Sequence, residues 1–250
     1  MILTDTHFHL WTMASSGADI KTLNIKSGMD IGTDPHDIEE RMPLIRMFPG
    51  IKYSIGAGPW CVRDGSLPED IDRGIREDLE KYRPSFLGEI GLDWFRDADG
   101  KEAQKKLFVL QLETAKDYSL PVIIHNRDAD EDVIAMLEEK RVPKGGIIHC
   151  FSADESFMKR ALELGFMISF SGTVTYKRNS ALRKICAMVP DECLLLETDS
   201  PYLTPEPLRG RPNDPEKIIH TYERVAEIRN TSLEELSELV EKNFQTLLAR

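Results

Sequence analysis

Short apolar segments rich in β-branched residues alternate with longer amphipathic segments along the whole chain. This alternation is typical of repeated strand–helix units. Strands are expected at residues 3–10, 28–32, 51–55, 86–92, 121–125, 146–151, 166–171 and 193–198. Because a closed parallel barrel can be built from eight such strands, the pattern predicts an α/β fold, a TIM-type (β/α)8 barrel.

The segments between these strands have helical periodicity, with apolar positions on one face and charged residues on the other. Helices are expected near residues 35–48, 69–82, 101–118, 130–141, 154–164 and 180–188. Asp214-Pro215 is typical of a helix start, and Ser232-x-x-Glu235 forms a capping box for the last helix. Residues 11–27 are rich in Ser, Gly and Thr, so only a partial helix is expected there.

Composition and charge narrow the functional classes. The chain has 250 residues, 41% of them hydrophobic, which fits one folded domain over residues 1–250. The 32 basic and 43 acidic residues give a net charge of −11, which argues against nucleic-acid binding through a broadly basic surface. A nuclease whose bound metals supply local positive charge remains compatible with this composition.

The sequence predicts a cytoplasmic protein, since it contains neither a membrane-spanning run of about 18 apolar residues nor a basic signal-peptide start. A membrane partner is therefore not expected, and no segment indicates an obligate protein partner. Its four cysteines form no Cys-x-x-Cys pair, which predicts reduced thiols in the core.

Four of the six histidines fall near the ends of expected strands: His7, His9, His125 and His149. Residues two apart in a strand point the same way, so Asp5, His7 and His9 are expected to face the barrel interior. A His-x-His pair of this kind can clamp a metal ion. Alternatively, two such histidines could be a polar plug with satisfied hydrogen bonds.

Two acidic residues interrupt apolar strands. Glu89 lies between glycines in an apolar run, and Asp199 ends the run that starts at Leu194. Burying an unpaired carboxylate is costly, so each acid needs a partner, which could be an ion pair, a helix N-terminus or a metal ion. Four histidines and two acids at the ends of five strands together favour metal ions.

Five sequence blocks resemble the TatD family of metal-dependent deoxyribonucleases, within the amidohydrolase superfamily. In chain order they are Asp5-Thr6-His7-Phe8-His9-Leu10, Gly88-Glu89-Ile90-Gly91-Leu92-Asp93, Pro121-Val122-Ile123-Ile124-His125-Asn126-Arg127-Asp128-Ala129, His149-Cys150-Phe151-Ser152 and Glu197-Thr198-Asp199-Ser200-Pro201-Tyr202-Leu203. The resemblance implies a TIM-type barrel that hydrolyses DNA phosphodiesters. It also implies one divalent ion held by His7, His9, Glu89 and Asp199, and a second held by Glu89, His125 and His149.

Ligand chemistry agrees with two ions, because one ion that keeps an open position seldom uses six protein ligands. The mixed nitrogen and oxygen donors suit Zn, Mn, Ni or Mg without choosing among them. We predict Asp199 and Glu89 as the catalytic residues, with Asp199 accepting the proton of a metal-activated water. Substrate contacts are expected from Arg127, Lys177 and Arg209, and from Trp60 as a stacking face, unless Trp60 is instead a core residue.

One departure from the family pattern concerns the third strand. The family shows Gly-x-His-Pro there, whereas this chain has Gly58 at the histidine position, followed by Pro59 and Trp60. The expected function is removal of nucleotides from single-stranded or frayed DNA ends, in the 3′-to-5′ direction by family resemblance. Because metal pairs also polarise carbonyls, the alternative is hydrolysis of a small ester or amide, such as a D-aminoacyl ester on transfer RNA. A third hypothesis is a metal-dependent binding protein without turnover, against which the complete ligand set counts.

Overall fold

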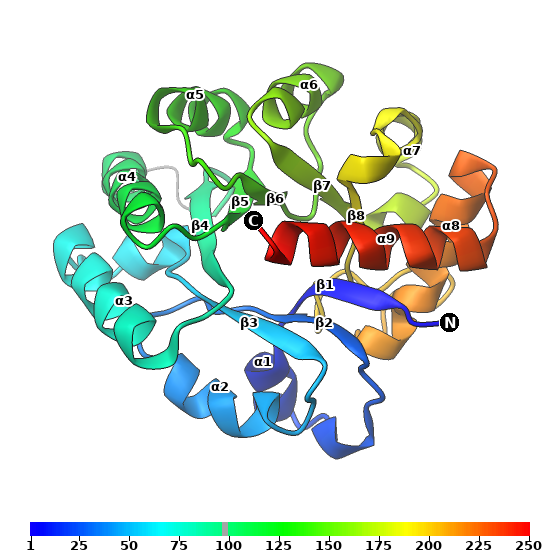
Figure 1. The fold of residues 1–250 in the computed structure, drawn as a ribbon, viewed down its shortest axis with the longest axis horizontal. Helices are drawn as coiled ribbons and strands as arrows, with labels where there is room; N and C mark the ends of the chain where they lie inside the picture. Colours follow the sequence, from blue (N-terminus) through cyan, green and yellow to red (C-terminus); the bar gives the residue numbers. More distant parts are fainter. Residues whose placement is uncertain (97–99) are drawn as a thin grey trace.

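Eight parallel strands follow one another in chain order around the molecule (Figure 1). This computed structural model describes residues 1–96 and 100–250. The strands are β1 (Thr4–Phe8), β2 (Ser27–Asp30), β3 (Ile51–Ile55), β4 (Phe86–Asp93), β5 (Val122–Arg127), β6 (Gly146–Ile148), β7 (Phe166–Phe170) and β8 (Leu194–Leu196). The predicted (β/α)8 barrel of the TIM type is thereby confirmed.

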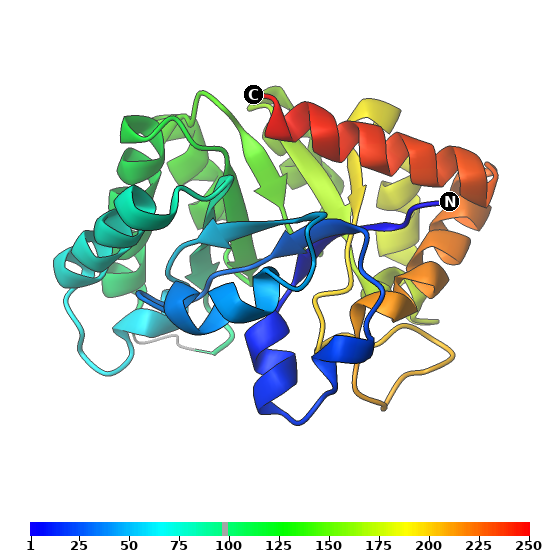
Figure 2. The same cartoon turned by 60° about the horizontal axis from the view of Figure 1, so that its bottom comes forward.

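Helices connect successive strands and surround the barrel (Figure 2). They are α1 (Leu10–Ser15), α2 (Ile38–Ile45), α3 (Pro68–Tyr82), α4 (Lys101–Asp117), α5 (Asp130–Lys140), α6 (Glu155–Glu163), α7 (Ser180–Met188), α8 (Ile218–Arg229) and α9 (Leu233–Leu248), with short 3₁₀ turns at Ile20–Thr22, Pro59–Val62, Gly172–Thr175, Asp191–Cys193 and Pro215–Lys217. Among the described residues, no helix is long and apolar enough to cross a membrane.

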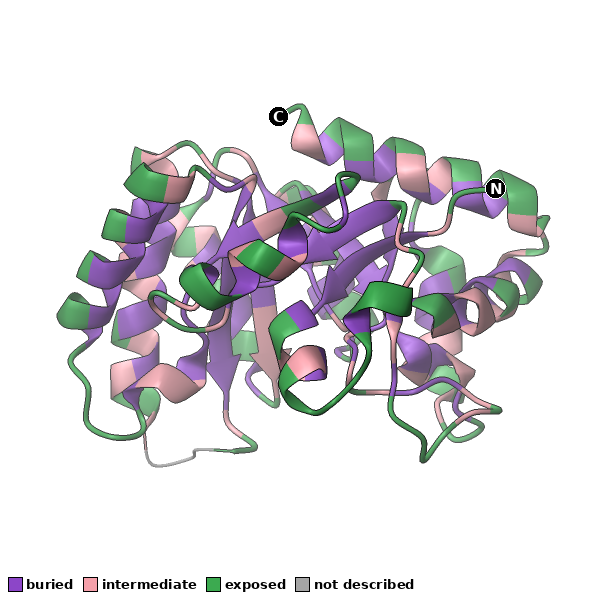
Figure 3. Ribbon diagram, turned by 90° about the horizontal axis from the view of Figure 1, so that it is seen from below, coloured by how far each residue is buried: buried purple, intermediate pink, exposed green. Residues whose placement is uncertain are grey.

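Most strand residues are buried, while the outer faces of the helices are exposed (Figure 3). This burial explains why strands such as β6 and β8 appear in the sequence as continuous apolar runs, whereas β1 and β3 also contain polar residues. The four cysteines are free, as the absence of a paired motif predicts. Cys186 is buried in the core, whereas Cys61, Cys150 and Cys193 are only partly buried, so the predicted core position is wrong for these three.

The barrel closes between β8 and β1 beyond the last residue of β8. Phe8 and Ser200 form a parallel bridge, and the His9 amide donates to the Ser200 carbonyl at 2.9 Å. The Asp199 amide donates to the His7 carbonyl, also at 2.9 Å. Backbone hydrogen bonds at the seam therefore hold three candidate site residues, His7, His9 and Asp199, beside one another.

Helix α9 lies across the amino-terminal end of the barrel, where the strands begin. Its Glu241 carboxylate accepts hydrogen bonds from Thr4 and Ser27, at the starts of β1 and β2. Its Asn243 side chain donates to the Leu194 carbonyl at the start of β8. The predicted Ser232–Glu235 capping box begins this helix. The amino-terminal end of the barrel is thus covered, and the carboxyl-terminal end carries the loops.

Several predicted boundaries differ from the structure. Strands β1, β6 and β8 end at Phe8, Ile148 and Leu196, so His9, His149 and Asp199 lie just after them. The ladder between β1 and β2 is also irregular between Asp5 and Phe8. The region from Pro215 begins as a 3₁₀ turn before α8, and α2 is shorter than the helical pattern of residues 35–48.

A buried arginine joins β2, β3 and α2 near the start of α1. The Arg41 side chain is 2% exposed, and it donates to the Asp30 and Asp37 carboxylates, each at 2.8 Å. It also donates to the Ser54 carbonyl. The other Asp30 oxygen accepts the Leu10 amide at 2.8 Å, so this network fixes the start of α1.

We expect Arg41→Ala to lower the free energy of unfolding by about 3–5 kcal/mol, because it leaves the fully buried Asp30 carboxylate without its partner. Urea unfolding followed by circular dichroism measures the change. Arg73→Ala is the matched control, since Arg73 pairs with Asp70 on the exposed face of α3 and its loss should cost less than about 1 kcal/mol. Equal midpoints for the two variants would contradict a stabilising role for the Arg41 network.

Candidate metal centre and active site

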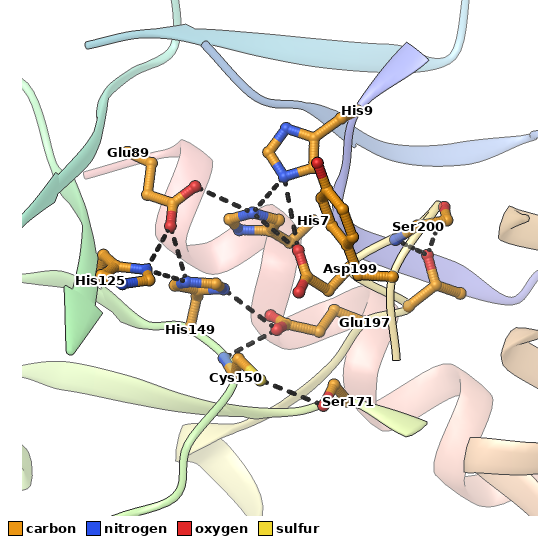
Figure 4. Close-up of polar contacts among 12 residues, drawn as sticks. His7, His9, Glu89, His125, His149, Cys150, Ser171, Glu197, Asp199 and Ser200 are labelled. Atoms are coloured by element: carbon orange, nitrogen blue, oxygen red, sulfur yellow. Dashed lines mark hydrogen bonds and ion pairs between the residues drawn. The ribbon is translucent and has the colours of Figure 1, made fainter. Parts of the chain in front are cut away.

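Six polar side chains converge at the carboxyl-terminal end of the barrel (Figure 4). This is the end at which barrels of this kind bind their substrates. Each side chain comes from within a strand or from the segment just after it. The six are His7 and His9 from β1, Glu89 from β4, His125 from β5, His149 after β6 and Asp199 after β8.

Glu89 lies at the centre of this cluster. Its Oε1 atom is 2.6 Å from His125 Nδ1 and 3.0 Å from His149 Nε2. Its Oε2 atom is 3.5 Å from His7 Nε2. The two oxygens of one buried carboxylate therefore face different sets of histidines, which is the arrangement that a bridging ligand requires.

The second set contains His7, His9 and Asp199. The Nε2 atoms of the two histidines lie 3.3 Å apart, and Asp199 Oδ1 is 3.4 Å from His9 Nε2 and 3.7 Å from His7 Nε2. On the other side of Glu89, His125 Nδ1 and His149 Nε2 are also 3.3 Å apart. The structure thus brings all six predicted ligands together.

The donor atoms fit divalent metal ions. Two histidine nitrogens that face each other at 3.3 Å present either two lone pairs or a proton between them, and the cluster contains two such pairs. A cation held by such a pair would accept both lone pairs. Groups of ligand atoms within 4.8 Å of one another are His7, His9, Glu89; His7, His149, Asp199; and Glu89, His125, His149. Glu89 belongs to two of the three groups.

The pKa directions show the same need for positive charge. Burial raises the pKa of Glu89, but the charge of His149 and hydrogen bonds from His125, His149 and His7 outweigh it and hold the pKa well below its usual value. Burial lowers the pKa of His149, but Glu89 and Glu197 outweigh it and raise the pKa well above the usual value. A bound divalent ion would supply this positive charge, and its histidine ligands would be neutral.

Two further carboxylates hold the outer ring nitrogens of the histidines. Asp93 Oδ2 is 3.3 Å from His125 Nε2, and Glu197 Oε1 is 3.3 Å from His149 Nδ1. Such contacts fix the tautomer and the orientation of a ligating imidazole. This role was not predicted from the sequence. The spacing from Glu89 to Asp93 was an available signal, because residues an even number apart in a strand point the same way, whereas Glu197 lies after the end of β8.

Asp5 holds the backbone segments that carry His7 and Asp199. Its carboxylate accepts the Thr198 amide at 2.9 Å, the Thr198 hydroxyl at 2.6 Å and the His7 amide at 3.3 Å. Burial, only partly offset by the Thr198 hydrogen bonds, raises its pKa to about 8. The side chain therefore ties β1 to the segment that carries Asp199, in the barrel interior where the sequence pattern places it.

A glycine allows β4 and β5 to approach. Gly91 pairs with His125 in the ladder and has a φ of 145°, in the region that favours glycine. A Cβ atom there would lie 2.0 Å from the His125 carbonyl oxygen. The glycine after Glu89 is thus required for the close packing that brings Glu89 to His125.

The comparisons with known proteins agree with this geometry. A family model described as TatD related DNase matches residues 4–249. The chain belongs to this TatD family. It is 33% identical over 254 residues to a Bacillus subtilis protein, "Uncharacterized metal-dependent hydrolase YabD", with 98% of each chain covered. Membership and this relationship make the chain a metal-dependent hydrolase of the TatD family.

Solved structures of similar proteins share the TatD barrel. YjjV, a TatD homologue from Escherichia coli, superposes with a TM-score of 0.88 and 28% identity, and the match covers 98% of this chain and 97% of that one. An uncharacterized amidohydrolase from Saccharomyces cerevisiae gives a TM-score of 0.81 over 99% of each chain at 18% identity, which shows the fold alone.

A cavity of about 980 Å³ opens beside the candidate metal ligands of this TatD protein. Two of the four predicted substrate-binding residues, Trp60 and Arg127, line it. Lys177 lines a separate hollow of about 430 Å³, and the Arg209 guanidinium lies over the Tyr176 ring, 4.4 Å from its centre. Neither is among the residues described as lining the metal-site cavity.

Two arginines that the sequence analysis missed line the same cavity. Arg63 follows the turn after β3, and Arg96 follows β4. The available signal was their position, because both lie in loops that leave the carboxyl ends of strands. Other cavity-lining residues include Thr33, Asp34, Ser152, Thr173, Asn179 and Tyr202.

Proposed function

We propose that this TatD protein hydrolyses phosphodiester bonds at the ends of single-stranded or frayed DNA with two divalent ions. His7, His9, Glu89 and Asp199 would hold one ion, and Glu89, His125 and His149 the other. The observation that carries the proposal is the position of Glu89, whose two oxygens face separate donor sets beside a cavity with three arginines.

Paired divalent ions activate water, orient a phosphate and stabilise the leaving oxygen. The chain's own residues then have distinct tasks. Glu89 holds the two halves of the cluster together, and Asp93 and Glu197 orient His125 and His149. Asp199 lines the cavity with Oδ1 towards His9 and His7, and its carboxylate accepts the proton of the attacking water.

Positive charge is concentrated on one wall of the cavity. Arg63, Arg96 and Arg127 come from the loops after β3 and β4 and from the end of β5. Arg127 is half-buried, and its guanidinium lies 4.0 Å from the centre of the exposed Phe95 ring, which holds it at the mouth. These side chains provide local phosphate contacts on a protein whose net charge is −11.

The size of the cavity favours a strand end. A volume of about 980 Å³ matches the upper range of small-ligand pockets, roughly 300–1,000 Å³. Such a space can hold a nucleotide or two but not a duplex. One or two nucleotides at a free or frayed end can enter it and reach the metal cluster.

We expect linear single-stranded DNA with labelled ends to be shortened from its 3′ end, while a circular single strand of the same sequence resists. The measurement compares both substrates with Mg²⁺, Mn²⁺, Ni²⁺ or Zn²⁺, and Glu89→Ala protein purified in parallel controls for contaminating nucleases. RNA, aminoacyl-tRNA and simple esters are assayed with the same preparation. Equal cleavage of circular and linear DNA would contradict end-directed action, and faster hydrolysis of aminoacyl-tRNA would favour the small-ester alternative.

A further inference from the structure

The indole ring of Trp60 covers Gly58. Both belong to the segment after β3, where Pro59 begins a 3₁₀ turn over Pro59–Val62. A Cβ atom on residue 58 would lie 2.2 Å from indole Cζ2 and 2.4 Å from Cε2. The Gly58 amide donates to the Thr33 carbonyl at 2.8 Å, which fixes the backbone at this point. The indole therefore occupies the space that a side chain at position 58 would need.

The same ring forms part of the active-site wall. Its centre is 5.6 Å from the centre of the His125 ring, and the two planes meet at 87°. Trp60 is half-buried and lines the cavity that also contains Glu89 and Arg63. The other two tryptophans lie elsewhere: Trp94 donates to Asp132, and Trp11 is exposed on α1.

We propose that Gly58 and Trp60 together form a stacking subsite for the nucleobase next to the scissile phosphodiester. The inference rests on the proposed function and assigns a base-binding position within it. An apolar ring beside a metal ligand suits a flat, uncharged group, whereas the adjacent arginines suit phosphate oxygens. Stacking uses the π-face that every base has, so this subsite accepts all four bases.

The two positions act as one unit. A methyl group added in Gly58→Ala forces the indole out of its place. This variant, like Trp60→Ala, should therefore lose the preference for a strand end that carries a base over an abasic end. The double variant should lose no more than either single one. Such non-additivity distinguishes a shared subsite from two independent effects.

The kinetic test compares linear single-stranded DNA carrying a normal terminal nucleotide with the same strand carrying an abasic terminal nucleotide. Base stacking on an aromatic side chain changes affinity by a factor of about 5 to 150, so the wild type should prefer the normal end by a factor in this range. Trp60→Ala should reduce this ratio to near 1, and Trp60→Phe should restore part of it. Trp11→Ala changes an exposed side chain of α1 and should keep the wild-type ratio.

A binding test gives a readout that does not depend on turnover. In a Trp11→Phe, Trp94→Phe background, Trp60 is the remaining tryptophan and can be excited selectively over the tyrosines. Thymidine 5′-monophosphate added to the Mg²⁺-loaded protein should quench its fluorescence, and 2-deoxyribose 5-phosphate should not. Thermal unfolding of each variant checks that the barrel is intact.

Two outcomes would overturn the subsite. One is an unchanged preference ratio in Trp60→Ala, including the case in which both rates fall together, since that reports a structural role. The other is equal quenching by the nucleotide and the sugar phosphate. If the protein cleaves DNA but shows either outcome, the subsite fails while the proposed function stands. If it cleaves no DNA, the proposed function fails, and the fluorescence titration still decides whether Trp60 stacks on a base.

Discussion

Glu89→Ala is expected to remove most of the bound divalent metal and with it the hydrolytic activity. The wild type should hold about two equivalents after loading and desalting. Glu89 contributes one oxygen towards His125 and His149 and the other towards His7, so its loss weakens both sets of donors at once. Metal analysis by mass spectrometry measures the occupancy of each protein.

The matched control is Asp34→Asn, which changes another carboxylate of the same cavity. Asp34 accepts hydrogen bonds from the Thr33 hydroxyl and the Cys61 thiol rather than facing the histidines. This variant should keep about two equivalents. Saturation of the wild type at one equivalent, or full occupancy in Glu89→Ala, would remove the bridging role of Glu89.

The barrel could be predicted because most strand residues are buried, so strands such as β6 and β8 appear as compact apolar runs between amphipathic helices. The ends of the strands were less predictable. The predicted strands extended past His149 and up to Thr198, whereas the hydrogen-bond ladder stops at Ile148 and Leu196. Pairing with the neighbouring strand, which a local pattern does not contain, decides where a strand ends.

The six candidate ligands could be predicted because each lies in a short motif within or just after a strand, and a parallel barrel brings such motifs together. The directions in which the loops carry their side chains could not be predicted. Lys177 and Arg209 follow β7 and β8 as expected, but their chains lead them to another hollow and to the Tyr176 ring. Arg41 was missed because its partners, Asp30 and Ser54, come from two other elements.

The environment of Trp60 could be narrowed to two possibilities from the sequence but not decided. Its position after β3 allowed either a stacking face or a core residue. The structure places it half-buried in the cavity wall, since the space above Gly58 admits the indole. A contact between residues two apart in an irregular turn has no periodic signal in the sequence.

Asp199→Asn should lower turnover by at least about two orders of magnitude, because general-base catalysis is worth about 10² to 10⁴ in rate and an amide cannot accept the proton. The substitution otherwise preserves the residue. Asp199 has a φ of 55°, and asparagine adopts this left-handed conformation readily. The backbone hydrogen bond to His7 is retained, and the amide oxygen can still face His9.

The measurements are kcat, KM and metal content on the best substrate of the panel. We expect KM to change far less than kcat, and the ion at Glu89, His125 and His149 to remain bound. Asp128→Asn is the matched control: Asp128 has a φ of 56° and is exposed after β5, so the same substitution in the same backbone conformation should leave turnover near wild type. Near-wild-type turnover in Asp199→Asn would exclude Asp199 as the proton acceptor. Glu197, which already contacts His149, would then be the next carboxylate to test.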